Sequence, residues 1–146
     1  MIEPIVIEYD LPLGTVDAFS CYTQCIGDWW PAGFTAHGED GLDAIVIEPY
    51  AGGRVYERGN DGATYDWGVV RAYDAGVGLV HSFHLAQDKQ HPTEVAVCFI
   101  DAPGGCRMRL EHRGWRPENV QARSKFLPTG GGWDVVLGAF VEFARS

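Results

Sequence analysis

The chain has 146 residues, of which 46% are hydrophobic and 12% aromatic, so it has the length and the side chains for a buried core and is not a disordered segment. Its formal net charge of −9 argues against nucleic-acid binding, which begins with Lys and Arg neutralising phosphates. No run of about 18 apolar residues exists, and residues 1–12 lack the basic start of a secretory signal. We therefore expect one domain over 1–146, located in the cytoplasm, with neither a membrane nor a nucleic acid as partner.

A strand and two short helices are predicted near the N-terminus. Residues 5–9 alternate in hydropathy, as a half-buried strand does. Thr15 is placed to cap a helix over 16–22, whose apolar side would contain Val16, Phe19 and either Ala18 or Tyr22. A second helix over 26–30 would end before Pro31, because the residue preceding a proline disfavours the α conformation.

Two adjacent tryptophans close this second helix. Neighbouring helical residues point about 100° apart around the axis, so Trp29 and Trp30 cannot enter the same space. We expect Trp30 to close the core or a cavity, and Trp29 to cover the helix–sheet junction near Pro31.

Six segments with the composition of strands follow, separated by Gly, Pro and Asp. They are residues 41–50, 53–59, 64–73, 78–86, 93–102 and 106–115. Short connections between consecutive strands predict an antiparallel sheet. In residues 64–73 the inward face stays undecided, because Tyr65, Trp67 and Val69 compete with Gly68 and Val70.

The register of the last predicted hairpin follows from its two apolar faces. Residues opposite one another point to the same side, which predicts the pairs Phe99–Met108, Val97–Leu110 and Val95–His112. The other face would then pair Glu94 with Arg113 and Cys98 with Arg109. This register leaves residues 102–105 as a four-residue loop, and it places Cys98 and Cys106 on opposite faces, where they cannot form a disulfide.

The cysteines and histidines give little support for a metal site. The four cysteines include no CxxC pair, and we expect buried free thiols, although Cys21 and Cys25 share one helix face. His81 and His84 point to opposite faces of a predicted strand and so cannot share an ion. No metal and no cofactor are expected.

A long C-terminal helix is the last predicted element. Its apolar residues recur at helical period from Trp133 through Val136, Leu137, Phe140, Val141 and Ala144. Thr129 and the adjoining glycines mark its start. These glycines favour either a flexible lead into the helix or backbone N–H groups presented to an anion.

Charge is distributed unevenly along the chain. Residues 1–53 hold nine acids and no Lys or Arg, whereas residues 107–125 hold six of the eleven basic residues. Two interpretations are open: an anion-binding patch, or a basic strand that lies beside the acidic N-terminal part.

Several short motifs in this order resemble a known family. They are DWWP, GGRVYERG, YDWGVV, TEVAVCF, RLEHRGW and GGGWDVVLGAFVEF. The chain resembles the small SRPBCC proteins related to the C-terminal domain of Aha-type activators of a heat-shock chaperone ATPase. That group belongs to the helix-grip superfamily, with START domains, pollen-allergen relatives and polyketide cyclases.

The resemblance implies an α+β helix-grip fold. A seven-stranded antiparallel sheet would curl around the C-terminal helix, with two short helices after the first strand. The first strand would pair with the last, which brings Glu3, Glu8 and Asp10 near Arg107 and Arg109. A cavity between sheet and helix often holds an apolar ligand in this superfamily.

The leading functional hypothesis is a non-enzymatic module that holds a small apolar or aromatic molecule in this cavity. The candidate lining residues are Trp30, Tyr65, Trp67, Phe83, Val97, Phe99, Met108, Leu110, His112, Trp133, Leu137 and Phe140. Two alternatives remain open. One is a cyclase or hydrolase in which His112 acts as acid–base and Tyr65 as hydrogen-bond donor. The other is a protein-binding role, with a chaperone or a second copy of the chain as partner.

Overall fold

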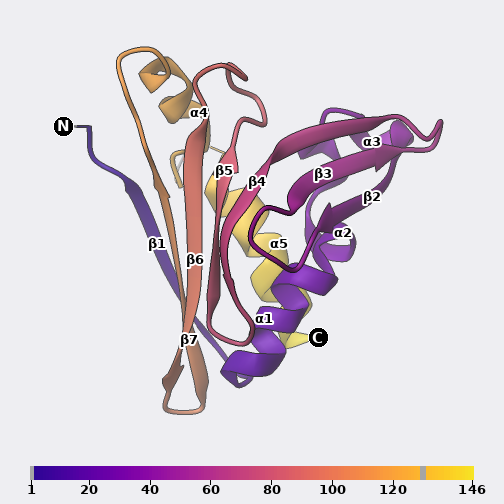
Figure 1. Cartoon of the computed structure of the whole chain (residues 1–146). Helices are drawn as coiled ribbons and strands as arrows, with labels where there is room; N and C mark the ends of the chain where they lie inside the picture. The colour runs from indigo at the N-terminus through magenta and orange to yellow at the C-terminus, as the bar shows by residue number, and fades with distance from the viewer. Residues whose placement is uncertain (1, 129–130) are drawn as a thin grey trace.

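The computed structural model describes residues 2–128 and 131–146 (Figure 1). Its strands are β1 (Ile5–Leu11), β2 (Leu42–Ile47), β3 (Arg54–Gly59), β4 (Thr64–Asp74), β5 (Gly78–Phe83), β6 (Thr93–Ala102) and β7 (Gly105–Arg113). Its helices are α1 (Thr15–Gln24), α2 (Ile26–Trp29), α3 (Gly38–Gly41), α4 (Arg123–Phe126) and α5 (Trp133–Arg145). Two 3₁₀ turns, η1 (Ala32–Phe34) and η2 (Val120–Ala122), complete the order.

The seven strands form one antiparallel sheet in the order β1-β7-β6-β5-β4-β3-β2. The sheet curls, and α5 lies along its concave face with α1 and α2 close by (Figure 1). The predicted helix-grip architecture is confirmed, including the pairing of the first strand with the last.

The core forms between the sheet and the apolar stripe of α5. Trp133, Val136, Leu137, Phe140 and Val141 are all buried, as their helical spacing predicted. The facing strands contribute their alternate residues, among them Val97, Phe99, Met108 and Leu110. Full burial of one such side chain stabilises a fold by about 1.5–3 kcal/mol, so this contact is the main attachment of α5.

The register of the β6–β7 hairpin is as predicted, from Glu94–Arg113 to Phe99–Met108. The predicted four-residue loop was wrong, because Ala102 pairs with Gly105 and only Pro103 and Gly104 remain in the turn. Two residues suffice because proline presets φ near −65° and Gly104 takes a positive φ of 82°.

A bulge in β4 resolves the undecided face of that strand. The register with β3 shifts between the pairs Val55–Gly68 and Tyr56–Asp66, which leaves Trp67 as the extra residue. Trp67 and Val70 are therefore both buried, whereas Tyr65 and Val69 are exposed. Simple alternation cannot predict this pattern, because the bulge changes the phase of the strand.

The N-terminal helices differ from prediction at their ends. Gly14, rather than Thr15, is the N-cap of α1, and Thr15 is the first helical residue. Val16 is 69% exposed, so the apolar side of α1 consists of Ala18, Phe19 and Tyr22. Helix α1 runs to Gln24, beyond the predicted end at residue 22.

At the C-terminal helix, Gly132 is the N-cap and α5 begins at Trp133. The helix start predicted at Thr129, and Gly130 of the candidate anion loop, lie outside the described residues. Four short elements, η1, α3, η2 and α4, were not predicted, because three or four residues are too few to show a period.

Acidic and basic residues face each other across β1 and β7, as one of the two charge interpretations predicted. Asp10 lies 3.1 Å from Arg107, and Glu8 lies 3.8 Å from Arg109. Glu3 precedes the strand, and its carbonyl oxygen accepts a hydrogen bond from Arg123. These side chains are substantially exposed, so the pairs favour the register more than they add stability.

All four cysteines are free, and Cys106 is buried. Among residues 2–128 and 131–146, no three His, Cys, Asp or Glu side chains cluster as metal ligands. In the same part of the chain, no helix combines the length and hydropathy needed to cross a bilayer.

Two glycine substitutions test the packing of β4 and α5. A Cβ at Gly68 would overlap the carbonyl group of Ser82, so Gly68→Ala is expected to lower the free energy of unfolding by about 1–3 kcal/mol. A Cβ at Gly138 meets no atom within 4 Å, so Gly138→Ala is expected to raise that free energy by about 0.5–1 kcal/mol. Urea denaturation measures both, and equal effects of the two substitutions would contradict the described packing.

Candidate functional site

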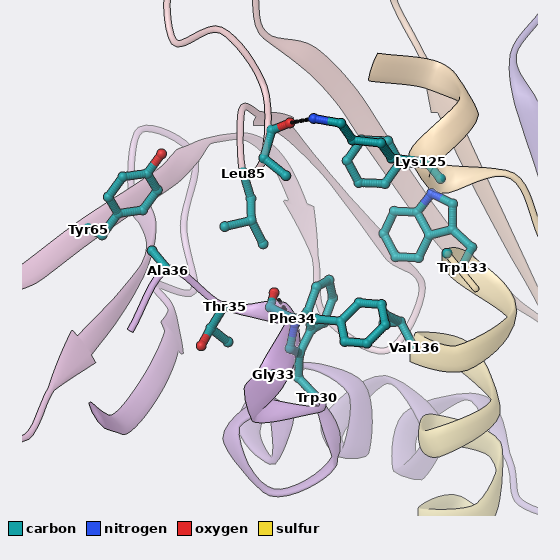
Figure 2. Close-up of a pocket in the computed structure, with 13 residues that line it drawn as sticks. Trp30, Gly33, Phe34, Thr35, Ala36, Tyr65, Leu85, Lys125, Trp133 and Val136 are labelled. Carbon is teal, nitrogen blue, oxygen red and sulfur yellow. Dashed lines mark hydrogen bonds between the residues drawn. The ribbon is translucent and has the colours of Figure 1, made fainter. Parts of the chain in front are cut away.

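A cavity of about 440 Å³ lies at the N-terminal end of α5. Four parts of the chain form its wall (Figure 2). They are Trp30 with residues 33–36 after α2, Tyr65 of β4, residues 85–86 after β5, and Lys125, Phe126, Gly132, Trp133 and Val136 around the start of α5. This volume falls within the range of about 300–1,000 Å³ that is usual for small-molecule sites.

The floor of the cavity is buried and its rim is exposed. The floor is formed by buried residues, namely Trp30, Leu85, Trp133 and Val136. The rim carries Phe34, Ala36, Tyr65, Ala86 and Lys125, all of which are exposed. The cavity therefore opens to solvent between η1, the first residues of β4 and α4.

Trp30, which was expected to close the core or a cavity, lies in the cavity wall. Its ring packs 4.7 Å from Trp67 and 5.9 Å from Trp133, measured between ring centroids. Its indole N–H donates to the carbonyl oxygen of Phe34 at 3.2 Å, which holds the η1 turn against the ring.

Trp29 has a different position from the predicted one. Its ring packs on Tyr22 of α1 and Phe140 of α5, at 5.1 and 4.9 Å. Its indole N–H lies 3.1 Å from the carbonyl oxygen of Cys21, to which it donates. Trp29 thus joins α1 to α5, and the expected cover of a helix–sheet junction was wrong, because its ring lies between these two helices.

Of the twelve candidate lining residues, the structure places Trp30, Tyr65 and Trp133 in the cavity wall. The other nine are buried in the core: Trp67, Phe83, Val97, Phe99, Met108, Leu110, His112, Leu137 and Phe140. The sheet closes tightly on the middle of α5, and the aromatic cavity lies at the N-terminal end of the helix.

The sequence reasoning missed most of the wall. Phe34, Ala36, Leu85, Lys125 and Phe126 line the cavity but lie on turns or on the four-residue helix α4. Such segments carry no hydrophobic period. The one available signal was that aromatic residues cluster around the predicted end of the second helix and the predicted start of the C-terminal helix.

His112 is fully buried and both of its ring nitrogens have partners. The Trp133 indole N–H donates to Nδ1 at 3.0 Å, and an indole nitrogen can only donate, so Nδ1 carries no proton. Nε2 therefore carries the proton and donates to the Thr93 hydroxyl at 2.6 Å. Burial, with smaller contributions from His81 and Arg123, lowers the pKa of His112 to about 3.

The structure does not bring His112 and Tyr65 into one pocket. His112 lies behind the rings of Trp133 and Phe126, 5.7 and 4.8 Å away between centroids, whereas Tyr65 lies on the exposed rim. A neutral imidazole with both nitrogens engaged acts as a support for Trp133.

Glu57 is a buried charged residue that sequence reasoning missed. It is 0% exposed and accepts four hydrogen bonds. Oε1 accepts from the Trp67 indole at 2.7 Å and from the Ala36 backbone at 2.8 Å. Oε2 accepts from the His37 backbone at 2.8 Å and from His37 Nδ1 at 2.6 Å. Its place between Val55 and Gly59 on the inward face of β3 was the signal in the sequence.

These hydrogen bonds attach one wall of the cavity to the sheet. Burial raises the pKa of Glu57, but the hydrogen bonds from Trp67, Ala36 and His37 outweigh it, and the net pKa lies below its ordinary value of 4.5. The ionised carboxylate holds residues 36 and 37 in place, and Ala36 forms part of the rim.

The sequence model of a family described as "Activator of Hsp90 ATPase homolog 1-like protein" matches residues 27–144. The chain belongs to this family. The matched range contains every residue of the cavity wall and the Glu57 carboxylate. No curated protein sequence matches this Aha1-like chain.

Solved structures share its fold. The Aha1 dimer from Colwellia psychrerythraea is 14% identical, with a TM-score of 0.69 over 99% of this chain and 97% of that one. Protein MLL2253 from Mesorhizobium loti is 19% identical, with a TM-score of 0.69 over 96% and 95%. An anthrahydroquino-gamma-pyrone synthase, Txn09, solved as a complex, is 20% identical, with a TM-score of 0.65 over 97% and 96%. At these identities the likeness establishes the fold of the Aha1-like chain alone.

The Glu57→Gln substitution tests the attachment of the cavity wall. The glutamine NH₂ group would meet N–H donors, so the free energy of unfolding at neutral pH is expected to fall by about 2–4 kcal/mol. Because the folded-state pKa is lowered, the wild-type carboxylate stabilises the fold above its ordinary pKa and loses this effect as pH falls below it. Glu142→Gln, on an exposed position of α5, is the control. Equal stability of the two variants would contradict the role of Glu57.

Nitrogen-15 NMR of the histidine side chains tests the state of His112. The expected spectrum is that of a neutral ring protonated at Nε2, unchanged between about pH 8 and pH 5. The unfolded chain binds a proton at this histidine near pH 6.5, so its burial destabilises the fold as pH falls below that value, until the folded pKa of about 3 is reached. A His112 resonance that titrates near pH 6.5 would disprove this assignment.

Proposed function

We propose that this Aha1-like chain binds a small apolar or aromatic molecule in the cavity at the N-terminal end of α5 and performs no chemistry on it. The cavity itself is the observation that carries this proposal. Five aromatic rings line it, those of Trp30, Phe34, Tyr65, Phe126 and Trp133. Aromatic walls around a small-molecule site bind mainly by removing apolar surface from water.

The arrangement of polar groups supports binding rather than catalysis. Both indole N–H groups in the wall are used internally, by the carbonyl of Phe34 and by Nδ1 of His112. The Glu57 carboxylate lies next to the wall, but its two oxygens already accept four hydrogen bonds. A general acid or base needs a proton position within reach of the substrate, and neither His112 nor Glu57 has one.

Binding of a neutral aromatic probe tests the proposal. N-phenyl-1-naphthylamine is expected to gain fluorescence with the wild-type protein and to raise its melting temperature, because a ligand that binds only the native state stabilises it. Ala36→Trp places a large ring at the rim while leaving the backbone N–H that holds Glu57, and it is expected to weaken binding about tenfold or more.

Ala51→Trp is the matched control, since Ala51 is exposed in the β2–β3 connection and lies outside the cavity wall. It is expected to leave probe affinity within about twofold of wild type. The proposal fails if the wild type does not bind the probe, or if both tryptophan variants bind it equally well.

A further inference from the structure

Few polar groups in the cavity wall remain available to a ligand. The Thr35 hydroxyl donates to the Ala32 carbonyl at 2.6 Å and accepts from the Gly38 backbone at 3.0 Å. The indole N–H groups of Trp30 and Trp133 are also engaged. The remaining side-chain groups are the Tyr65 hydroxyl and the Lys125 ammonium, which lie on opposite sides of the cavity (Figure 2).

Lys125 carries the one charge in the cavity wall as the structure describes it over residues 2–128 and 131–146. Its Nζ donates to the Ala86 carbonyl at 3.2 Å, and Lys125 lies at the edge of the cavity in Figure 2. An ammonium has three donors, and in this same part of the chain that carbonyl is its one hydrogen-bond partner.

Six of the ten other basic residues are paired with acids. Arg54, Arg58, Arg71, Arg107, Arg109 and Arg113 each lie within 4.0 Å of a carboxylate. Among the described residues Lys125 has no such partner, and neither do Lys89, Arg116, Arg123 and Arg145, but of these five only Lys125 lies in the cavity wall. The Glu39 carboxylate lies next to Gly33 of the cavity wall.

The backbone beside Lys125 is held in an uncommon conformation. Ala86 has φ of +59°, a left-handed value that costs a non-glycine residue about 1 kcal/mol or more. This conformation lies at the rim, where the Ala86 carbonyl meets the ammonium. The contact holds the Lys125 ammonium at the rim of the cavity.

We propose that the ligand is a planar aromatic molecule with one anionic group, and that the Lys125 ammonium binds this group. The rings of Trp30, Phe126 and Trp133 cover the aromatic body, and the two remaining donors of Lys125 bind the anion at the rim. A charge-assisted hydrogen bond at a partly apolar site is stronger than a neutral one. This inference rests on the proposed binding function and adds the chemical class of the ligand.

Two probes that differ in charge test the inference. 1-Anilinonaphthalene-8-sulfonate has nearly the same aromatic body as N-phenyl-1-naphthylamine but carries a sulfonate. The dissociation constants of both probes are measured by fluorescence for wild type, Lys125→Gln and Lys89→Gln. Lys89 is the other lysine of the chain, is exposed and lies outside the cavity wall, so its substitution is a matched control for net charge.

Lys125→Gln is expected to lower the affinity for the anionic probe about three- to tenfold and to leave the affinity for the neutral probe within about twofold of wild type. Lys89→Gln is expected to leave both affinities unchanged. Added salt is expected to lower the affinity of the wild type for the anionic probe, because salt screens the charge contact. The same addition is expected to have less effect on Lys125→Gln.

The inference is overturned if both lysine variants lose the same affinity for the anionic probe, or if Lys125→Gln loses none. In either case, binding of the neutral probe leaves the proposed binding function standing. Failure of the wild type to bind either probe overturns the binding function and the inference together. Lys125 is exposed, so the melting temperature of Lys125→Gln is expected to equal that of the wild type, which confirms that the variant is folded.

Discussion

An unpartnered carboxylate inside a protein would destabilise the fold by several kcal/mol, and this constraint shapes one whole side of the molecule around Glu57. The four donors that surround this carboxylate come from Ala36, His37 and Trp67. They tie the segment after α2 to β3 and to the bulge of β4. Trp30 packs on Trp67, so the tryptophan wall of the cavity depends on the same attachment.

The interior is solid along most of α5 and hollow at one end, and the two regions are built differently. Regular strands cover the middle of α5, where their alternate side chains interdigitate with those of the helix. Turns and the short helix α4 cover the N-terminal end, and they cannot supply evenly spaced side chains. His112 lies at the boundary, where its hydrogen bond positions Trp133 between the core and the cavity.

Regular elements were predictable because their periods appear in the sequence. The β6–β7 register followed from Val95, Val97 and Phe99, and the stripe of α5 followed from residues three and four apart. The bulge at Trp67 was not predictable, because it breaks the alternation on which strand prediction rests. Glu57 was visible as a charge on an inward position of β3, but its four partners lie up to 21 residues away.

Trp29 and Trp30, which precede Pro31, show what the sequence determined and what the tertiary structure determined. The sequence by itself determined that Trp29 and Trp30 diverge, because adjacent residues of a helix point in different directions. It also determined the order of the strands along the chain and the apolar face of α5. Only the tertiary structure decided that Trp29 joins two helices while Trp30 lines a cavity. Those positions depend on which distant segments meet each ring, and long-range contacts leave no period in the sequence.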